Sequence, residues 1–257
     1  MNCFKTQAIY ALCLFFLTCG IDEYYYLPQL SESKIDSKMN TYAGINLPNN
    51  FFSQNQASYA LGFTIFYKIY ISNLDINMVN DINNYRDSAI YKDYNNLYQY
   101  TDPSNTTSIT SLTTFSSRGF YELELEGIDI KEKVLSYLII SNSKPPGITF
   151  NIRFPTRDGD KPYIEYNGIE YSLLRSNDRG AFNPKPDRYF RNSDELKDYT
   201  NATSTINADV SGQQSTINAQ DKAYASMYIV AVGQNPRNFT RLYSKPTHIN
   251  IFLLPQN

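Results

Sequence analysis

The sequence lacks several residues on which common protein chemistries depend. The 257-residue chain has no tryptophan, one histidine and three cysteines, and Cys3, Cys13 and Cys19 all fall in the first 19 residues. The rest of the chain therefore has no thiol for a disulfide, a thiolate metal site or a cysteine nucleophile. With His248 as the only histidine, multi-histidine zinc centres and HExxH metalloproteases are excluded. No GxSxG, P-loop or dinucleotide-binding motif is present.

The chain also lacks a strong excess of either charge. Its 23 basic and 25 acidic side chains give a formal charge of −2, which provides no basic field for a nucleic-acid backbone. Hydrophobic residues make up 42% of the chain, too many for an intrinsically disordered protein. We therefore expect a folded core, no nucleic-acid partner and no cofactor.

Long hydrophobic runs are absent except near the N-terminus, where residues 8–17 form an apolar stretch behind a single lysine. This stretch has the length of a signal-peptide core and is shorter than the roughly 20 residues that a membrane-spanning helix needs. It ends in Phe-Leu-Thr-Cys-Gly at residues 16–20, which resembles the lipobox of bacterial lipoproteins. The resemblance implies that residues 1–18 are a signal peptide and that Cys19 carries a diacylglyceryl group. The alternative is an ordinary secretory peptide in which Cys19 is incidental.

Lipidation at Cys19 would make the membrane the first partner of the protein. Each buried CH₂ group stabilises membrane binding by roughly 0.8 kcal/mol, so two or three acyl chains would anchor the chain stably. Residues 19–55 are polar and irregular, and we predict a tether with a first edge strand near residues 24–28. We expect the protein in the bacterial cell envelope, at the outer membrane or cell surface rather than the inner membrane.

The rest of the chain shows the patterns of a mainly β protein. Residues 59–71 are β-branched and aromatic with Lys68 as their only charge, which predicts a central, largely buried strand. Asn167-Gly168 separates two alternating runs and predicts a hairpin with a type I′ turn over residues 162–174. We predict further strands at residues 120–126, 133–140, 147–154, 224–232 and 247–254.

Three of these segments resemble the third, sixth and seventh strands of fibronectin type III domains. Residues 62–68 resemble the Gly-Tyr-x-Val-x-Tyr-Arg pattern of the third strand, and residues 228–235 resemble the sixth strand with its outgoing loop. Residues 244–251 resemble the Ser-x-Pro-x-x-Val-x-Val entry to the seventh. The resemblance implies an immunoglobulin-like β-sandwich with core strands in residues 56–74 and 222–257. The family's second-strand tryptophan is absent.

The long connection between these core strands predicts a large α+β insertion over residues 75–221. Apolar residues at steps of three and four predict one amphipathic helix at about residues 75–98. The insertion also contains the hairpin and a polar, low-complexity stretch in which STINA at residues 204–208 recurs at 215–219. Together, a lipobox with Phe16 in place of the usual leucine and the Asn-, Ile- and Tyr-rich composition resemble lipoproteins of the spirochaete type.

One loop interleaves cationic and aromatic side chains, which is a composition typical of binding surfaces. Such a loop can hold acidic glycans, nucleic acid or another protein through charge and stacking. The alternative is a solvated loop whose aromatic residues cap the sandwich. The candidate residues are Arg175, Arg179, Phe182, Lys185, Arg188, Tyr189, Phe190 and Arg191.

Acidic residues provide two weaker candidates. Alternation over residues 120–126 places three glutamates on one strand face, which we interpret as the water-facing side of a half-buried strand. These glutamates are Glu122, Glu124 and Glu126. Asp158 and Asp160 could offer oxygens to Ca²⁺, but no EF-hand ligand series follows them, so we predict no metal site.

The single histidine lies in the last predicted strand. Alternation there places His248 and Asn250 on the face opposite Ile249 and Ile251. We therefore expect His248 to be an exposed strand residue without a role in catalysis.

These observations favour a non-enzymatic binding or adhesion module, anchored through the N-terminal lipid, with a protein or glycan ligand. The lipobox, the sandwich strands and the absence of a catalytic constellation support this hypothesis. One alternative is a glycoside hydrolase whose two carboxylates meet only in three dimensions. The other is a structural component of an envelope assembly, which would present a flat apolar patch.

Overall fold

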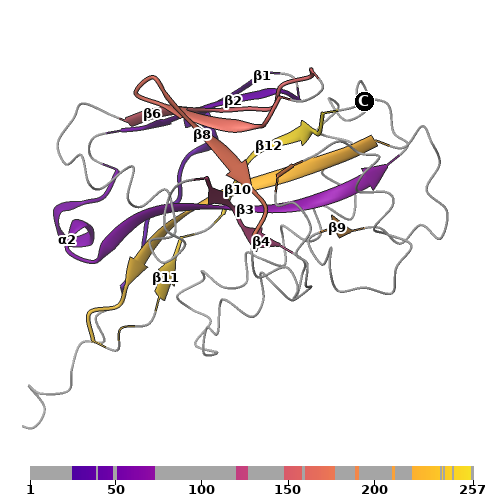
Figure 1. Ribbon diagram of the computed structural model, residues 1–257. Helices are drawn as coiled ribbons and strands as arrows, with labels where there is room; N and C mark the ends of the chain where they lie inside the picture. The colour runs from indigo at the N-terminus through magenta and orange to yellow at the C-terminus, as the bar shows by residue number, and fades with distance from the viewer. Residues whose placement is uncertain are drawn as a thin grey trace, which may run out of the picture.

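The apolar run at residues 59–71 forms the centre of one of two β-sheets in the computed structural model (Figure 1). The structure describes residues 25–38, 40–48, 51–72, 120–126, 148–157, 160–176, 189–190, 210–211, 222–237, 239, 241–244 and 246–255. This part of the chain is mainly β, as predicted. Its helices are one 3-10 turn, η1 (Glu32–Lys34), and the short α2 (Gln54–Ala57).

Sheet B is built on two long strands, β3 (Ala60–Ser72) and β10 (Lys222–Gln234), which pair antiparallel along their length. Both are rich in β-branched and aromatic residues, which pack well on a pleated surface. β10 also pairs with two later strands, and β3 pairs with two short ones. These four are β11 (Arg241–Tyr243), β12 (Thr247–Leu253), β4 (Tyr121–Glu122) and β9 (Val210–Ser211).

Sheet A lies against one face of sheet B (Figure 1) and is antiparallel throughout. Its spatial order is β1-β2-β6-β7-β8-β5. The hairpin predicted at residues 162–174 is confirmed, because Asn167 and Gly168 have φ of 50° and 75°, both in the left-handed region of a type I′ turn. The strands are β1 (Ile35–Lys38), β2 (Tyr42–Leu47), β6 (Ile148–Arg153), β7 (Tyr163–Tyr166), β8 (Ile169–Leu174) and β5 (Glu124–Leu125).

Alternation along the strands directs one side of each sheet into a shared core. Ile152 and Ile164 of sheet A and Ile65 and Ile229 of sheet B are all buried in the same cluster. Phe154, just after β6, stacks on Phe252 of β12 with ring centroids 4.6 Å apart. The two sheets are therefore held by apolar contact across their facing sides.

Residues 120–126 cross from one sheet to the other. β4 pairs with β3 in sheet B, and only one residue later β5 pairs with β8 in sheet A. The prediction that the three glutamates face water is wrong for two of them, because Glu122 and Glu124 are only 7% and 4% exposed. A segment that crosses between packed sheets has no free face, so alternation alone does not predict its exposure. Glu126, beyond the crossing, is exposed.

A β-bulge in β12 changes the phase of its side chains. Opposite Met227 and Tyr228 of β10 the register skips one residue, from Asn250 to His248. Ile249 consequently packs into the core, whereas Ile251 packs on the other side of sheet B. The prediction that these two isoleucines share a face is therefore wrong, and so is the prediction of an exposed His248, which is half-buried with its ring 5.0 Å from that of Tyr228.

The predicted boundaries place the strands of sheet A outside the sandwich core, yet these strands build half of it. β1 and β2 fall within residues 19–55, where we predicted mainly tether, and β5 to β8 fall within the predicted insertion at 75–221. Residues 25–28 form no strand. Several predictions lie outside the described residues: the signal peptide, Cys19, the helix at 75–98, the strand at 133–140 and the STINA repeat.

The N-terminal segment is tied to sheet B by polar contacts. The Thr247 hydroxyl donates to the carbonyl of Leu30 over 2.6 Å, and the Gln29 side-chain amide donates to the carbonyl of Pro246 over 3.0 Å. Leu27 and Leu30 are buried in the core cluster. In the described part of the chain, no helix is both long and apolar enough to cross a membrane.

Candidate binding surface

The side of sheet A that faces away from the core carries two rows of polar and aromatic side chains. Because opposed residues in antiparallel strands share a face, the register assigns each row directly. We call this surface the outer face of sheet A. The first row is Asp36, Gly44, Asn151, Glu165 and Glu170, and the second is Lys38, Tyr42, Arg153, Tyr163 and Ser172.

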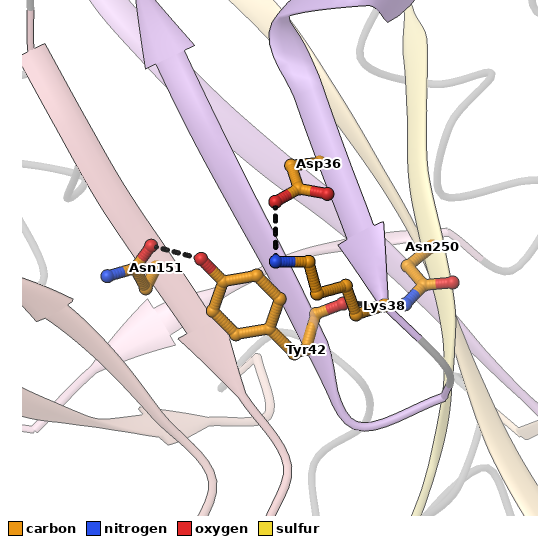
Figure 2. A network of polar contacts seen from close by, with 5 residues as sticks. All are labelled: Asp36, Lys38, Tyr42, Asn151 and Asn250. Atoms are coloured by element: carbon orange, nitrogen blue, oxygen red, sulfur yellow. Dashed lines mark hydrogen bonds and ion pairs between the residues drawn. The ribbon is translucent and has the colours of Figure 1, made fainter.

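Tyr42, the first residue of β2, projects onto this face (Figure 2). Its hydroxyl donates to the side-chain carbonyl of Asn151 over 2.9 Å, so the ring lies across β2 towards β6. A glycine at position 44 makes this arrangement possible, because a Cβ atom there would lie 2.7 Å from the Tyr42 hydroxyl. The ring therefore takes the space that a side chain at Gly44 would fill.

Two cations flank the Tyr42 ring. The Nζ atom of Lys38 lies 5.8 Å from the ring centroid, and the guanidinium carbon of Arg153 lies 5.2 Å from it. Each cation also has an acidic partner: Lys38 bonds to Asp36 at 3.2 Å (Figure 2), and Arg153 bonds to Glu165 at 3.3 Å. Exposed ion pairs of this kind contribute little stability. They place charges of both signs beside the aromatic ring.

A side chain of sheet B bonds to the backbone of Tyr42. The Asn250 side-chain amide donates to the carbonyl of Tyr42 over 3.1 Å (Figure 2), and its carbonyl accepts from the backbone N–H of Ile251 over 2.9 Å. The backbone N–H of Leu253 also donates to the carbonyl of Asn40. The β12 bulge thus anchors the strand that carries Tyr42.

Tyr163 extends the aromatic part of the face onto β7. Partial burial raises the pKa of its hydroxyl above the ordinary value, and the nearby negative charge of Glu170 raises it further. Arg153 acts in the opposite direction. The phenol is therefore neutral at physiological pH and can donate or accept a hydrogen bond.

A second polar cluster closes the far edge of the face. The Tyr189 hydroxyl donates to the Glu126 carboxylate, and Lys161 lies 3.8 Å from the same carboxylate and 3.7 Å from the centroid of the Tyr189 ring. The Tyr189 hydrogen bond lowers the pKa of Glu126 most, and a bond from Ser172 lowers it further. Ser172 also belongs to the second row, so this cluster continues the outer face of sheet A.

The predicted basic and aromatic loop is only partly represented in this surface. Tyr189 contributes to the Glu126 cluster, but Phe190 is 2% exposed and packs between Tyr67 and Phe154, with centroids 5.0 and 5.7 Å away. Arg175 is also buried. Neither Phe190 nor Arg175 is therefore accessible to a ligand at the surface. The other candidates, Arg179, Phe182, Lys185, Arg188 and Arg191, lie outside the described residues.

The acidic candidates do not form a site among the described residues. Glu122 accepts a hydrogen bond from the Thr64 hydroxyl over 2.7 Å in the interior, at the point where the chain crosses between sheets. Asp160 is exposed, and Asp158 lies outside the described residues. Within the described ranges, no three His, Cys, Asp or Glu side chains gather as they would around a metal ion.

The sequence did not indicate the residues around Tyr42, because they come from strands with weak signals. β1 is four residues long with three polar ones, and β2 contains a glycine and an asparagine. Alternation in residues 147–154 and 162–174 could have identified the outward set on β6, β7 and β8. Only the pairing of β2 with β6 brings Tyr42 and Arg153 together.

The arrangement suits recognition of a polar ligand. It offers charges of both signs, amide and hydroxyl groups, and a tyrosine ring fixed by its neighbours, all on one sheet. Comparison of the whole chain with protein-family models, with curated proteins and with solved structures gave no match in any of the three.

Proposed function

We propose that the protein is a lipid-anchored, non-enzymatic binding module of the bacterial cell envelope, and that the outer face of sheet A contacts its ligand. The observation that carries this proposal is the organised polar face around Tyr42. Its side chains are already held by hydrogen bonds and ion pairs. A surface ordered before binding loses less conformational entropy when a ligand arrives.

The chemistry of this face favours a protein or glycan ligand over nucleic acid. The face carries three acidic groups, Asp36, Glu165 and Glu170, against two basic ones, Lys38 and Arg153, so it offers no cationic track for a phosphate backbone. Tyrosine and arginine, which this face presents as Tyr42, Tyr163 and Arg153, are enriched at protein-binding surfaces. Glycans could use the same hydroxyl, amide and carboxylate groups.

We further propose that the two sheets form a sandwich of the fibronectin type III-like class. The supporting observation is strand adjacency in sheet B. β3, β10 and β12 carry the resemblance to the third, sixth and seventh strands, and β10 pairs antiparallel with both others. That adjacency is what the resemblance implies for these strands.

The anchor is tested by labelling cells with radioactive palmitate and separating the protein between detergent and aqueous phases. We expect label on the wild-type protein and its loss in Cys19→Ala, which would then move to the aqueous phase. Cys13→Ala is the matched control, since residue 13 belongs to the predicted leader. Retention of label and membrane association by Cys19→Ala would overturn the lipid anchor.

The binding surface is tested with the purified protein on a printed glycan array and on panels of extracellular matrix proteins. Any ligand found should bind Tyr42→Ala and Arg153→Ala at least about tenfold more weakly, since few central contacts carry most binding energy. Asn55→Ala, on exposed α2, is the control and should bind normally. Equal binding by all three variants would show that the ligand binds outside the outer face of sheet A. The glycoside hydrolase and envelope-scaffold alternatives remain predictions from the sequence.

A further inference from the structure

Three parts of the chain that are distant in sequence meet at one end of the molecule: residues 25–30, residues 54–61 with α2 and the start of β3, and residues 235–237 with Phe239. The Tyr59 hydroxyl donates to the carbonyl of Tyr26 over 2.8 Å. The rings of Tyr25 and Tyr59 meet edge to face at 5.3 Å, and the Arg237 guanidinium carbon lies 5.9 Å from the Tyr25 ring centroid. We call this end the tyrosine tip. In Figure 1 it lies around α2 and the end of β10 that meets β11.

The tyrosine tip presents large apolar side chains to solvent. Among the described residues, four large hydrophobic side chains are exposed, and three of them, Tyr26, Leu61 and Phe239, belong to these segments. Tyr26 is 64% exposed and Phe239 is 71% exposed. Core packing does not account for these two side chains, because neither Tyr26 nor Phe239 belongs to the core cluster.

Phe239 is held outward by an unusual backbone conformation. Its φ is 59°, in the left-handed region that bulky residues rarely adopt. The loop fixes this conformation through both backbone groups of Phe239. Its N–H donates to the carbonyl of Asn235 over 2.9 Å, and its carbonyl accepts from the Gln234 side chain over 3.2 Å. A strained residue that projects an aromatic ring into solvent indicates a functional contact.

The charge of these segments has one sign. Residues 25–30, 54–61 and 235–239 contain no aspartate or glutamate, and their one basic residue is Arg237. By contrast, the outer face of sheet A mixes both signs. A surface of exposed aromatic rings beside a cation such as Arg237 is suited to the interfacial region of a bilayer.

The tyrosine tip also lies close in sequence to the predicted lipid. Only five residues separate Cys19 from Tyr25, and a fully extended chain of this length spans about 20 Å. The acidic pair Asp22 and Glu23 lies in this connection and outnumbers Arg237. Attraction of this end to a membrane would therefore have to come mainly from the aromatic side chains.

We propose that the tyrosine tip rests on the bilayer surface, with Tyr26 and Phe239 in the headgroup region. The inference rests on the proposed lipid anchor at Cys19. It adds an orientation, because contact at this end fixes how the sandwich stands on the membrane and directs the remaining surfaces towards solvent.

The experiment uses the mature lipoprotein in vesicles of phosphatidylcholine with phosphatidylglycerol. Since Cys19 would be blocked by lipid and no other cysteine follows it, Phe239→Cys gives one reactive thiol for an environment-sensitive fluorophore. Ser37→Cys, on exposed strand β1 of the other sheet, is the matched control. Brominated lipids quench only fluorophores within the bilayer or its interface.

We expect the label at position 239 to lose roughly half of its emission in brominated vesicles, since interfacial side chains sit at headgroup depth. The label at position 37 should keep its emission. Equal, negligible quenching of both labels on protein that floats with the vesicles would overturn the membrane orientation and leave the anchor intact. Failure of both labelled proteins to float with vesicles would overturn the anchor, and the orientation with it.

Discussion

The outer faces of the two sheets have opposite character although both belong to the same pair of packed sheets. On sheet A, the outward side chains are polar, partly exposed and bonded to one another. On sheet B, Phe66, Tyr228, Val230 and Val232 face away from the core and are nonetheless buried, with Phe120 packed against them. The difference shows that two packed sheets can leave one outer face accessible to solvent and bury the other.

Polar groups on the two faces consequently have different roles. Thr64 and Lys68 on sheet B are buried: Thr64 bonds to Glu122, and the Lys68 ammonium lies 5.3 Å from the Phe120 ring centroid. On sheet A, comparable groups stay accessible to water. Substitutions on sheet B should therefore change stability, whereas those on sheet A should change binding.

The largest expected effect comes from Phe66→Ala. Truncation of this buried ring should lower the free energy of unfolding by about 3 to 5 kcal/mol, as is usual for buried phenylalanines. Tyr163→Ala on the outer face of sheet A should cost about 1 kcal/mol. Urea denaturation followed by circular dichroism measures both. Equal costs would show that the two outer faces are not as different as their burial indicates.

A smaller effect is expected from Thr64→Val, which removes the hydroxyl that donates to buried Glu122. Loss of a donor to a buried acceptor should cost about 1 to 3 kcal/mol. The same substitution at exposed Thr149 on β6 provides the matched control and should stay within about 0.5 kcal/mol of wild type. A cost at Thr149 as large as that at Thr64 would contradict the comparison.

Gly44→Ala should disturb the outer face of sheet A without unfolding the protein. The new Cβ would displace the Tyr42 hydroxyl and break its bond to Asn151, at a cost of about 1 kcal/mol. Tyr42→Phe removes the clashing oxygen, so Gly44→Ala should cost less in that background. A double-mutant cycle of unfolding free energies measures this coupling. Strictly additive effects would show that the hydroxyl and the glycine are independent.

The smallest effect is a pH dependence at the edge of sheet A. Because the Tyr189 hydrogen bond lowers the pKa of Glu126 in the folded protein, this carboxylate stabilises the fold above its ordinary pKa of 4.5, and the stabilisation is lost as pH falls through the lower folded value. Tyr189→Phe should raise that pKa towards 4.5. NMR titration of the Glu126 carboxyl carbon measures the change. An unchanged pKa in the variant would assign the shift to Ser172 and Lys161.

The fold was predictable where the signal is local. Residues 59–71 and the Asn167-Gly168 hairpin form the predicted structures because β-branched alternation and turn chemistry act over a few residues. β1 and β2 were missed because they are short, and because the bonds that stabilise β2 come from β6, far along the chain.

The candidate site was less predictable because it depends on contacts between segments that are distant in sequence. Neither the burial of Glu122 and Glu124 nor the bulge at Asn250 follows from alternation, since both depend on what the strand packs against. Tyr42 and Arg153 are functional candidates only because strand pairing places them together. Composition left two readings of Phe190 open, a ligand contact or an aromatic residue that caps the sandwich, and its burial agrees with the second.

The pairing of β3 with β10 constrains when the protein can fold. Residues 60–72 find their central partner only in residues 222–234, near the C-terminus. A ribosome or a translocation channel releases the N-terminal part first, so this part must wait for its partner strand. Contacts this distant in sequence also slow folding. A chain that cannot complete its central sheet until residues 222–234 have emerged stays unfolded during its synthesis, which would suit the export that the proposed lipid anchor requires.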